Sequence, residues 1–147
     1  MSEATIAFAS DHGGYDLKQL LLEDLRAKGF DVLDLGTNGP DSVDYPDYAA
    51  LMAKAIADGK AGRGVLLCGS GIGISIAANR YPHIRAALVH DGLTARLSRL
   101  HNDANVIAMG GRILGIELAK DCLDIFLNTK FEGGRHERRV AKMSHAG

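Results

Sequence analysis

Short apolar runs alternate with amphipathic stretches along almost the whole chain. Residues 5–9, 30–35, 65–68, 85–89 and 105–109 are apolar runs short enough to form buried strands. Between them, apolar residues recur at helical spacing, as Leu17, Leu21 and Leu25 do before Gly29, which suits a helix C-terminal cap. The same spacing predicts helices over residues 16–28, 47–58, 93–100 and 115–127, a helix after residues 69–73, and a basic C-terminal helix from about residue 134.

This alternation of strands and helices predicts the fold class. Strands joined through helices build a parallel sheet with helices on both faces. We therefore expect an α/β fold: a single-domain, doubly wound, Rossmann-like three-layer sandwich with a five-stranded parallel sheet, spanning residues 1–147. With the strand order 2-1-3-4-5, the order would reverse between the first and third strands. Such folds bind their ligands there, beyond the carboxyl ends of the strands.

Composition and charge narrow the classes of partner. With 46% apolar and 24% charged residues, the chain has the make-up of a globular domain in water. A net charge of −1 gives no reason to expect nucleic acid or a membrane surface as a partner. The N-terminal segment lacks the pattern of a signal peptide, and no apolar run approaches the ~18 residues of a membrane span. Cys68 and Cys122 form neither a disulfide framework nor a metal-type cluster, so we expect free thiols in a cytoplasmic protein.

A glycine loop follows directly on the third apolar run, with the sequence Gly69-Ser70-Gly71-Ile72-Gly73. The backbone N–H groups of such a loop can bind an anion. The loop does not match the dinucleotide fingerprint, because the place of the last glycine is taken by isoleucine, and it lacks the lysine of a P-loop. These two departures weaken the interpretation as a nucleotide site. Asp91 lies about where a ribose-binding acid could stand, so that interpretation stays open. The loop predicts a site for an oxyanion.

The residues at the strand ends each have two interpretations. Cys68 is either a small buried apolar residue or, beside a helix N-terminus, a reactive thiolate. Asp11 either caps the first helix or belongs to a site together with His12. The expected strand order would bring Asp11 and His12 beside Cys68 and the glycine loop. Cys122 lies in the apolar pattern of a helix and is expected to be core.

Further candidate groups lie later in the chain. His101 and Asn102 follow a predicted helix and form either a polar loop or part of a site, and Arg112 follows the fifth strand. Arg135 and Arg139 lie four residues apart, on one face of the basic helix. This pair either clamps a phosphate with forked hydrogen bonds or simply faces water.

Five segments, in this order, resemble one enzyme family: SDHGG, DYPDYA, CGSGIGISIAANR, LSRLHNDANVIAMGGR and EGGRHERRV. Over residues 5–140 the chain is similar to ribose-5-phosphate isomerase type B, in the group that includes the galactose-6-phosphate isomerase subunits. The resemblance implies isomerisation of an aldose phosphate to a ketose phosphate through an enediol, with no metal and no organic cofactor. Ribose 5-phosphate is the substrate it favours. A tetrose, allose or galactose phosphate stays open, as does a non-catalytic flavodoxin-like module that binds a phosphosugar or nucleotide.

The resemblance also implies a role for each candidate residue. Cys68 is the base that moves a proton between C1 and C2, since Ile74 stands where other members carry an acidic base. The loop residues Gly69, Ser70, Gly71, Ile72 and Gly73 hold the oxyanion that develops on the substrate. His101 opens the furanose ring. The remaining substrate-binding residues are Asp11, His12, Tyr45, Asn102, Arg112, Arg135 and Arg139.

Finally, the resemblance implies an assembly. Family members are homodimers or dimers of dimers whose sites lie at the subunit interface. The segment that carries His101 and Asn102, together with the basic C-terminal helix, reaches the site of the neighbouring subunit.

Overall fold

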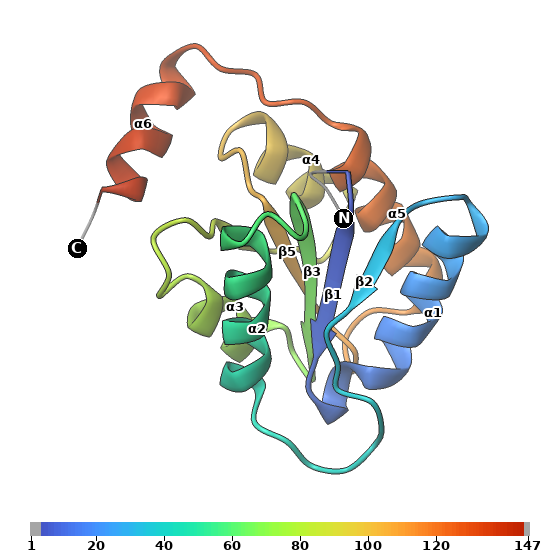
Figure 1. Cartoon of the computed structure of the whole chain (residues 1–147). Helices are drawn as coiled ribbons and strands as arrows, with labels where there is room; N and C mark the ends of the chain where they lie inside the picture. Colours follow the sequence, from blue (N-terminus) through green and yellow to red (C-terminus); the bar gives the residue numbers. More distant parts are fainter. Residues whose placement is uncertain (1–3, 146–147) are drawn as a thin grey trace.

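The computed structural model describes residues 4–145 and contains every element that the hydrophobic pattern predicts (Figure 1). Element ends move by a few residues, and the predicted strands 30–35 and 85–89 shorten to three residues each. The elements are β1 (Ile6–Ser10), the 3-10 helix η1 (His12–Gly14), α1 (Tyr15–Ala27), β2 (Val32–Asp34), α2 (Tyr45–Ala57), β3 (Arg63–Cys68), α3 (Ile72–Ala78), β4 (Ala86–Leu88), α4 (Gly92–Leu100), β5 (Val106–Gly110), α5 (Ile116–Asn128) and α6 (Arg135–Ser144).

All strand pairs are parallel, and the strand order is β2-β1-β3-β5-β4. The predicted order 2-1-3-4-5 is therefore wrong at one edge, because β5 lies between β3 and β4. Right-handed crossovers explain the arrangement, since the direction of each step across the sheet decides which face its helix covers. The connections from β2 to β3 and from β3 to β4 run toward the β4 edge, and they place α2 and α3 on one face. The connections from β1 to β2 and from β4 to β5 run in the opposite direction, and they place α1 and α4 on the other face.

Two apolar cores fill the spaces between the sheet and its helices. On one side, Phe8, Leu67 and Ile107 pack with residues of α1 and α5. On the other, Leu66 and Ala108 pack with residues of α2 and α3. Because successive strand residues point to opposite faces, strands covered on both sides need apolar residues at every position. This explains the uninterrupted apolar runs in the sequence and confirms the three-layer α/β sandwich.

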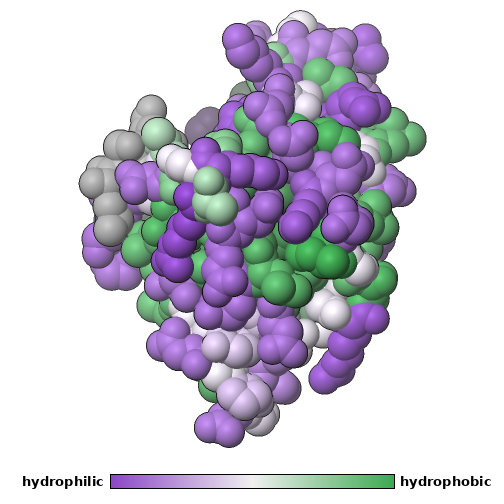
Figure 2. Space-filling view, turned by 90° about the vertical axis from the view of Figure 1, so that its right-hand side faces the viewer, coloured by the Kyte–Doolittle hydropathy of each residue, from purple (hydrophilic) through white to green (hydrophobic). Residues whose placement is uncertain are grey.

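The surface over α1 and α5 mixes hydrophilic side chains with apolar ones across its middle (Figure 2). Exposed apolar residues of these two helices include Leu20, which is 50% exposed, and Leu118. Scattered apolar residues are ordinary on protein surfaces. Among residues 4–145, the structure contains no helix with the length and hydrophobicity that a bilayer crossing requires.

The strand order reverses between β1 and β3, as predicted. The two strands pair directly, with Ser10 opposite Leu67, while their connections lead to opposite edges of the sheet. This divergence leaves the carboxyl ends of β1 and β3 open, so the residues after Ser10 meet those after Leu67.

The C-terminal helix α6 stands apart from the sandwich, beyond the amino-terminal ends of the strands (Figure 1). His136 is the buried residue of this helix, whereas Arg135 and Arg139 are exposed. The predicted basic helix from about residue 134 is thus present, but it adds no layer to the sandwich.

Candidate active site

The thiol of Cys68 lies at the carboxyl end of β3 and is part of the glycine loop. Its side chain is buried, and Sγ accepts a hydrogen bond from the backbone N–H of Gly71 at 3.1 Å. Gly71 has a φ of +80°, and a Cβ added there would lie 2.8 Å from both Leu88 Cδ1 and the carbonyl carbon of Met109. The loop therefore needs glycine at this position to turn back onto the sulfur.

Several backbone N–H groups of the loop remain available to a ligand. The Ile72 N–H donates to Ser70 Oγ at 3.1 Å. The N–H groups of Gly69, Ser70 and Gly73 donate to no acceptor within residues 4–145. Donors of this kind, fixed around one thiol, are suited to an oxygen that carries negative charge.

Asp11 and His12 meet this loop from β1. The buried Asp11 caps η1, with Oδ1 accepting from the N–H groups of Gly13 at 2.9 Å and Gly14 at 3.3 Å, as the capping interpretation predicts. Nδ1 of His12 accepts from the Val43 N–H at 3.2 Å. A neutral His12 ring therefore carries its proton on Nε2, which can donate to a ligand.

Tyr45 and Arg112 complete this group. A Cβ added at Gly73 would lie 2.6 Å from Tyr45 Cζ, and one at Gly69 would lie 3.2 Å from Arg112 Nη1. Both side chains therefore touch the glycine loop. Beside the loop, an open hollow of about 580 Å³ is lined by Asp11, His12 and residues 42–47, Tyr45 included.

His101 and Asn102 lie at the opposite end of the sheet from Cys68. Cys68 pairs with Gly110 at the carboxyl end of β5, whereas His101 caps α4 and precedes the start of β5 at Val106. The five residues from Val106 to Gly110 alone span roughly 13 Å at the rise of a strand. One chain thus holds two separate groups of predicted site residues. Asp11, His12, Tyr45, Arg112 and the Cys68 loop form one group; His101, Asn102, Arg135 and Arg139 lie toward the other end.

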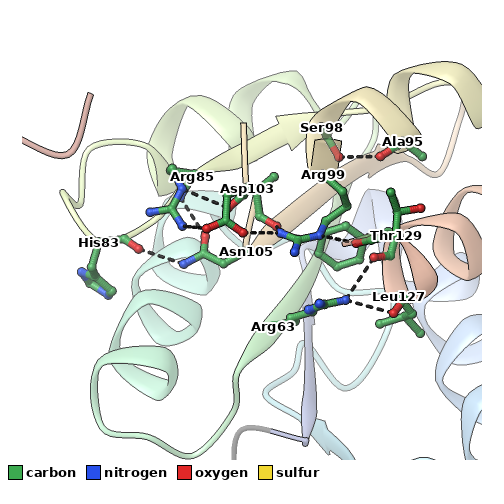
Figure 3. A network of polar contacts seen from close by, with 12 residues as sticks. Arg63, His83, Arg85, Ala95, Ser98, Arg99, Asp103, Asn105, Leu127 and Thr129 are labelled. Carbon is green, nitrogen blue, oxygen red and sulfur yellow. Dashed lines mark hydrogen bonds and ion pairs between the residues drawn. The ribbon is translucent and has the colours of Figure 1, made fainter. Parts of the chain in front are cut away.

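A buried arginine network fixes the turn that carries His101 (Figure 3). Arg99, only 6% exposed, donates from Nη1 to Asp103 Oδ1 and to the Ala104 carbonyl, both at 2.8 Å. Its Nε donates to the Thr129 carbonyl at 3.0 Å, just past the end of α5. From the other side, Arg85 Nε donates to the Asp103 carbonyl at 3.0 Å. The turn after α4 and the segment that leads to α6 are therefore held together.

His101 stacks on His136, a residue of α6. The ring centroids are 4.3 Å apart with an interplanar angle of 13°. Glu132 Oε2 lies 3.8 Å from His101 Nε2. Burial and the neighbouring His101 and Arg135 lower the pKa of His136. Of these two neighbours of His101, the sequence suggests His136 only as a weaker candidate than Arg135 and Arg139, and Glu132 was missed, although both lie in the EGGRHERRV segment.

The hollow nearest Asn102 is a second one, of about 450 Å³. It is lined by Asn102, Arg80, Arg85, Met143 and neighbouring residues of the α3–β4 connection. This hollow is distinct from the one beside the Cys68 loop.

Comparison with known proteins places this geometry in a family. The family model described as "Ribose/Galactose Isomerase" matches residues 6–143. The chain belongs to the ribose/galactose isomerase family. It is similar to ribose-5-phosphate isomerase B of Escherichia coli (strain K12), with 47% identity over 92% of this chain and 91% of the relative.

A solved ribose 5-phosphate isomerase from Thermotoga maritima is 50% identical to this family member, with a TM-score of 0.96 over 97% of this chain and 99% of that one. The D-erythrulose-4-phosphate isomerase of Pectobacterium atrosepticum is 43% identical over 96% of this chain and 93% of the relative. The fold and the isomerase family expected from the sequence are thus confirmed. The roles of the individual residues stay predictions.

Proposed function

We propose that this ribose/galactose isomerase interconverts ribose 5-phosphate and ribulose 5-phosphate. The observation that carries the proposal is a buried thiol, Cys68, on a loop whose N–H groups are free to bind an oxygen. Proton transfer next to a carbonyl needs these two elements together: a base at carbon and fixed donors at the oxygen that becomes charged.

The reaction begins with the open-chain aldose. The Cys68 thiolate takes the proton from C2, the C–H electrons form the C1–C2 double bond, and negative charge develops on O1. The N–H groups of Gly69, Ser70 and Gly73 stabilise that oxygen. The same thiol returns its proton to C1 while the proton of the C2 hydroxyl passes to O1, giving the ketose and regenerating the thiolate. These steps consume neither a redox partner nor an organic cofactor.

Substrate binding is assigned to the groups around this loop. His12 donates from Nε2 to the phosphate, Asp11 and Tyr45 hold sugar hydroxyls, and Arg112 binds near the phosphate. Arg135 and Arg139 add guanidinium groups, which suit phosphate oxygens. Asn102 binds the sugar and His101 acts as acid and base in opening the furanose ring.

The active site is proposed to lie between two subunits of a homodimer, alone or within a dimer of dimers. The separation of Cys68 and His101 by the length of the sheet supports this, because one chain cannot present both to a pentose phosphate. Near the loop, Ile72 is 48% exposed and Ile76 61%, so this end of α3 offers an apolar surface to a second copy.

Mixing two inactive variants tests the shared site. Homodimers of Cys68→Ala should be inactive, and those of His101→Ala nearly so on the ring-closed substrate. After exchange of equal amounts, half the dimers are mixed, and each has one site with both residues intact. We therefore expect about a quarter of wild-type activity in a coupled isomerase assay.

Subunit exchange needs its own control in that experiment. Carrying a different affinity tag on each variant allows mixed dimers to be isolated and counted. Mixed dimers that stay inactive would refute the shared site and leave the isomerase assignment standing.

The substrate is tested with a panel of aldose phosphates of four to six carbons, compared by kcat/KM. Ribose 5-phosphate should give the highest value. A tetrose phosphate is the second candidate, because the relative from Pectobacterium atrosepticum bears the name of an erythrulose-4-phosphate isomerase. Incorporation of solvent deuterium into the sugar separates catalysis from mere binding. A protein that binds phosphosugars without this exchange is not an isomerase.

Chelation should not slow the reaction. The proposed steps use a thiolate and N–H donors, so no Lewis acid is required. We expect enzyme dialysed against EDTA to keep its full rate in the same assay. Loss of activity that one added metal restores would contradict the mechanism.

A further inference from the structure

Three metal-binding side chains meet at the amino-terminal end of the sheet. His101, Glu132 and His136 each offer one ligand atom, and these atoms all lie within 4.8 Å of one another. They come from the end of α4, from the segment after α5 and from α6. The predicted phosphosugar chemistry gives Glu132 no role.

A second observation points to a ligand at this cluster. His136 is only 6% exposed, and its Nε2 is buried without a hydrogen-bond partner among the described residues. Imidazole nitrogens in protein interiors are ordinarily paired, because leaving one unpaired costs free energy.

We propose that His101, Glu132 and His136 form a site for Zn²⁺ that switches the enzyme off reversibly. Two imidazoles and one carboxylate are a donor set that zinc accepts, with the fourth position open to water. Mg²⁺ and Ca²⁺ prefer oxygen ligands and fit this set poorly.

To bind zinc, His101 must turn out of its stacking on His136 so that the ligand atoms reach bonding distance. Zinc–nitrogen bonds of about 2.0–2.1 Å put tetrahedral ligand atoms roughly 3.3 Å apart. His101 and Glu132 are 38% and 51% exposed and can turn, while the buried His136 stays in place. The Arg99 network holds the two segments that carry these ligands against each other. Glu132, Arg135 and Arg139 all act electrostatically on His136, and the charge of Glu132 opposes that of the two arginines.

Inhibition follows from the ligand that zinc would occupy. A nitrogen of His101 bound to zinc cannot carry the proton that ring opening requires. This consequence rests on the proposed function, whereas zinc binding itself does not. The test therefore measures binding separately from activity.

Zinc binding is measured by titration calorimetry on the assembled, metal-free protein, with ZnCl₂ as the probe. Cys68 is the obvious competing ligand, so every variant is made in the Cys68→Ser background. We expect one zinc per chain in that background. Glu132→Gln and His136→Gln should each weaken binding by at least about tenfold, the lower end of what losing even an outer-shell partner costs. Glu137→Gln, which changes the charge equally on the exposed side of α6, should bind like the parent.

Activity is then measured with Cys68 in place. Zinc should inhibit the wild type, EDTA should restore it, and MgCl₂ should have no effect. Glu132→Gln should isomerise substrate but resist zinc. Zinc binding that disappears in Cys68→Ser, or that is unchanged in both Glu132→Gln and His136→Gln, would overturn the site. Binding at the predicted residues without inhibition would refute the switch, and would also count against His101 as the ring-opening group.

Discussion

Replacing Cys68 by alanine should lower kcat by about 10²- to 10⁴-fold, the usual cost of deleting a general acid or base. The methyl group of alanine fits the space of the thiol but cannot accept a proton. The donors of the loop remain, so the phosphosugar should still bind with nearly normal affinity. Steady-state kinetics and a direct binding measurement on the same preparation separate the two effects.

Cys122 is the matched control for this prediction. It is fully buried in the core between α5 and the sheet, and burial raises the pKa of its thiol to about 11. Cys122→Ala should therefore keep its turnover. Iodoacetamide should inactivate the wild type through Cys68, with substrate protecting, while Cys122 stays unmodified in the folded protein. Near-normal turnover of Cys68→Ala would remove this thiol from the mechanism.

Replacing Arg139 by alanine should lower kcat/KM by roughly 30- to 5,000-fold. This range corresponds to the loss of about 2–5 kcal/mol when one partner of a desolvated charge pair is truncated. The effect should fall on phosphorylated substrate, because the guanidinium is assigned to the phosphate. Arg139→Lys should recover only part of the loss, since an ammonium cannot form the two parallel hydrogen bonds of a guanidinium.

Arg138 provides the control on the same helix. It is exposed like Arg139 and carries the same charge, but it points about 100° away around the helix axis. Arg138→Ala should therefore change kcat/KM little. If Arg139→Ala and Arg138→Ala both behave like the wild type, α6 is only a solvated basic helix.

The elements of the fold could be predicted from the sequence, but the order of the strands could not. Buried strands and amphipathic helices have distinct periodicities, which is why each was found close to its observed position. The place of β5 between β3 and β4 depends on which face α4 covers. Periodicity says that a helix has an apolar face and not which side of the sheet that face meets.

The candidate site also contains one part that the sequence could predict and one part that it could not. Asp11 and His12 follow the carboxyl end of β1, and Cys68 is the last residue of β3, so the strand-end rule brought them together correctly. That rule does not apply to His101, which lies at the other end of the sheet. Only the family resemblance connected His101 with the thiol of Cys68. The cluster with Glu132 and His136 could not be predicted, because it depends on how the segment after α5 returns to α4.

Because α6 lies apart from the sandwich, its sequence can change the charge on this helix without changing the stability of the fold. Its residues other than His136 lie outside the core, so most substitutions along α6 should leave the free energy of unfolding almost unchanged. Under the proposed function, the same substitutions would alter the charges that the helix offers to a substrate. On that proposal, relatives with this fold could change which anion they favour through substitutions in one exposed helix, without compensating mutations in the core.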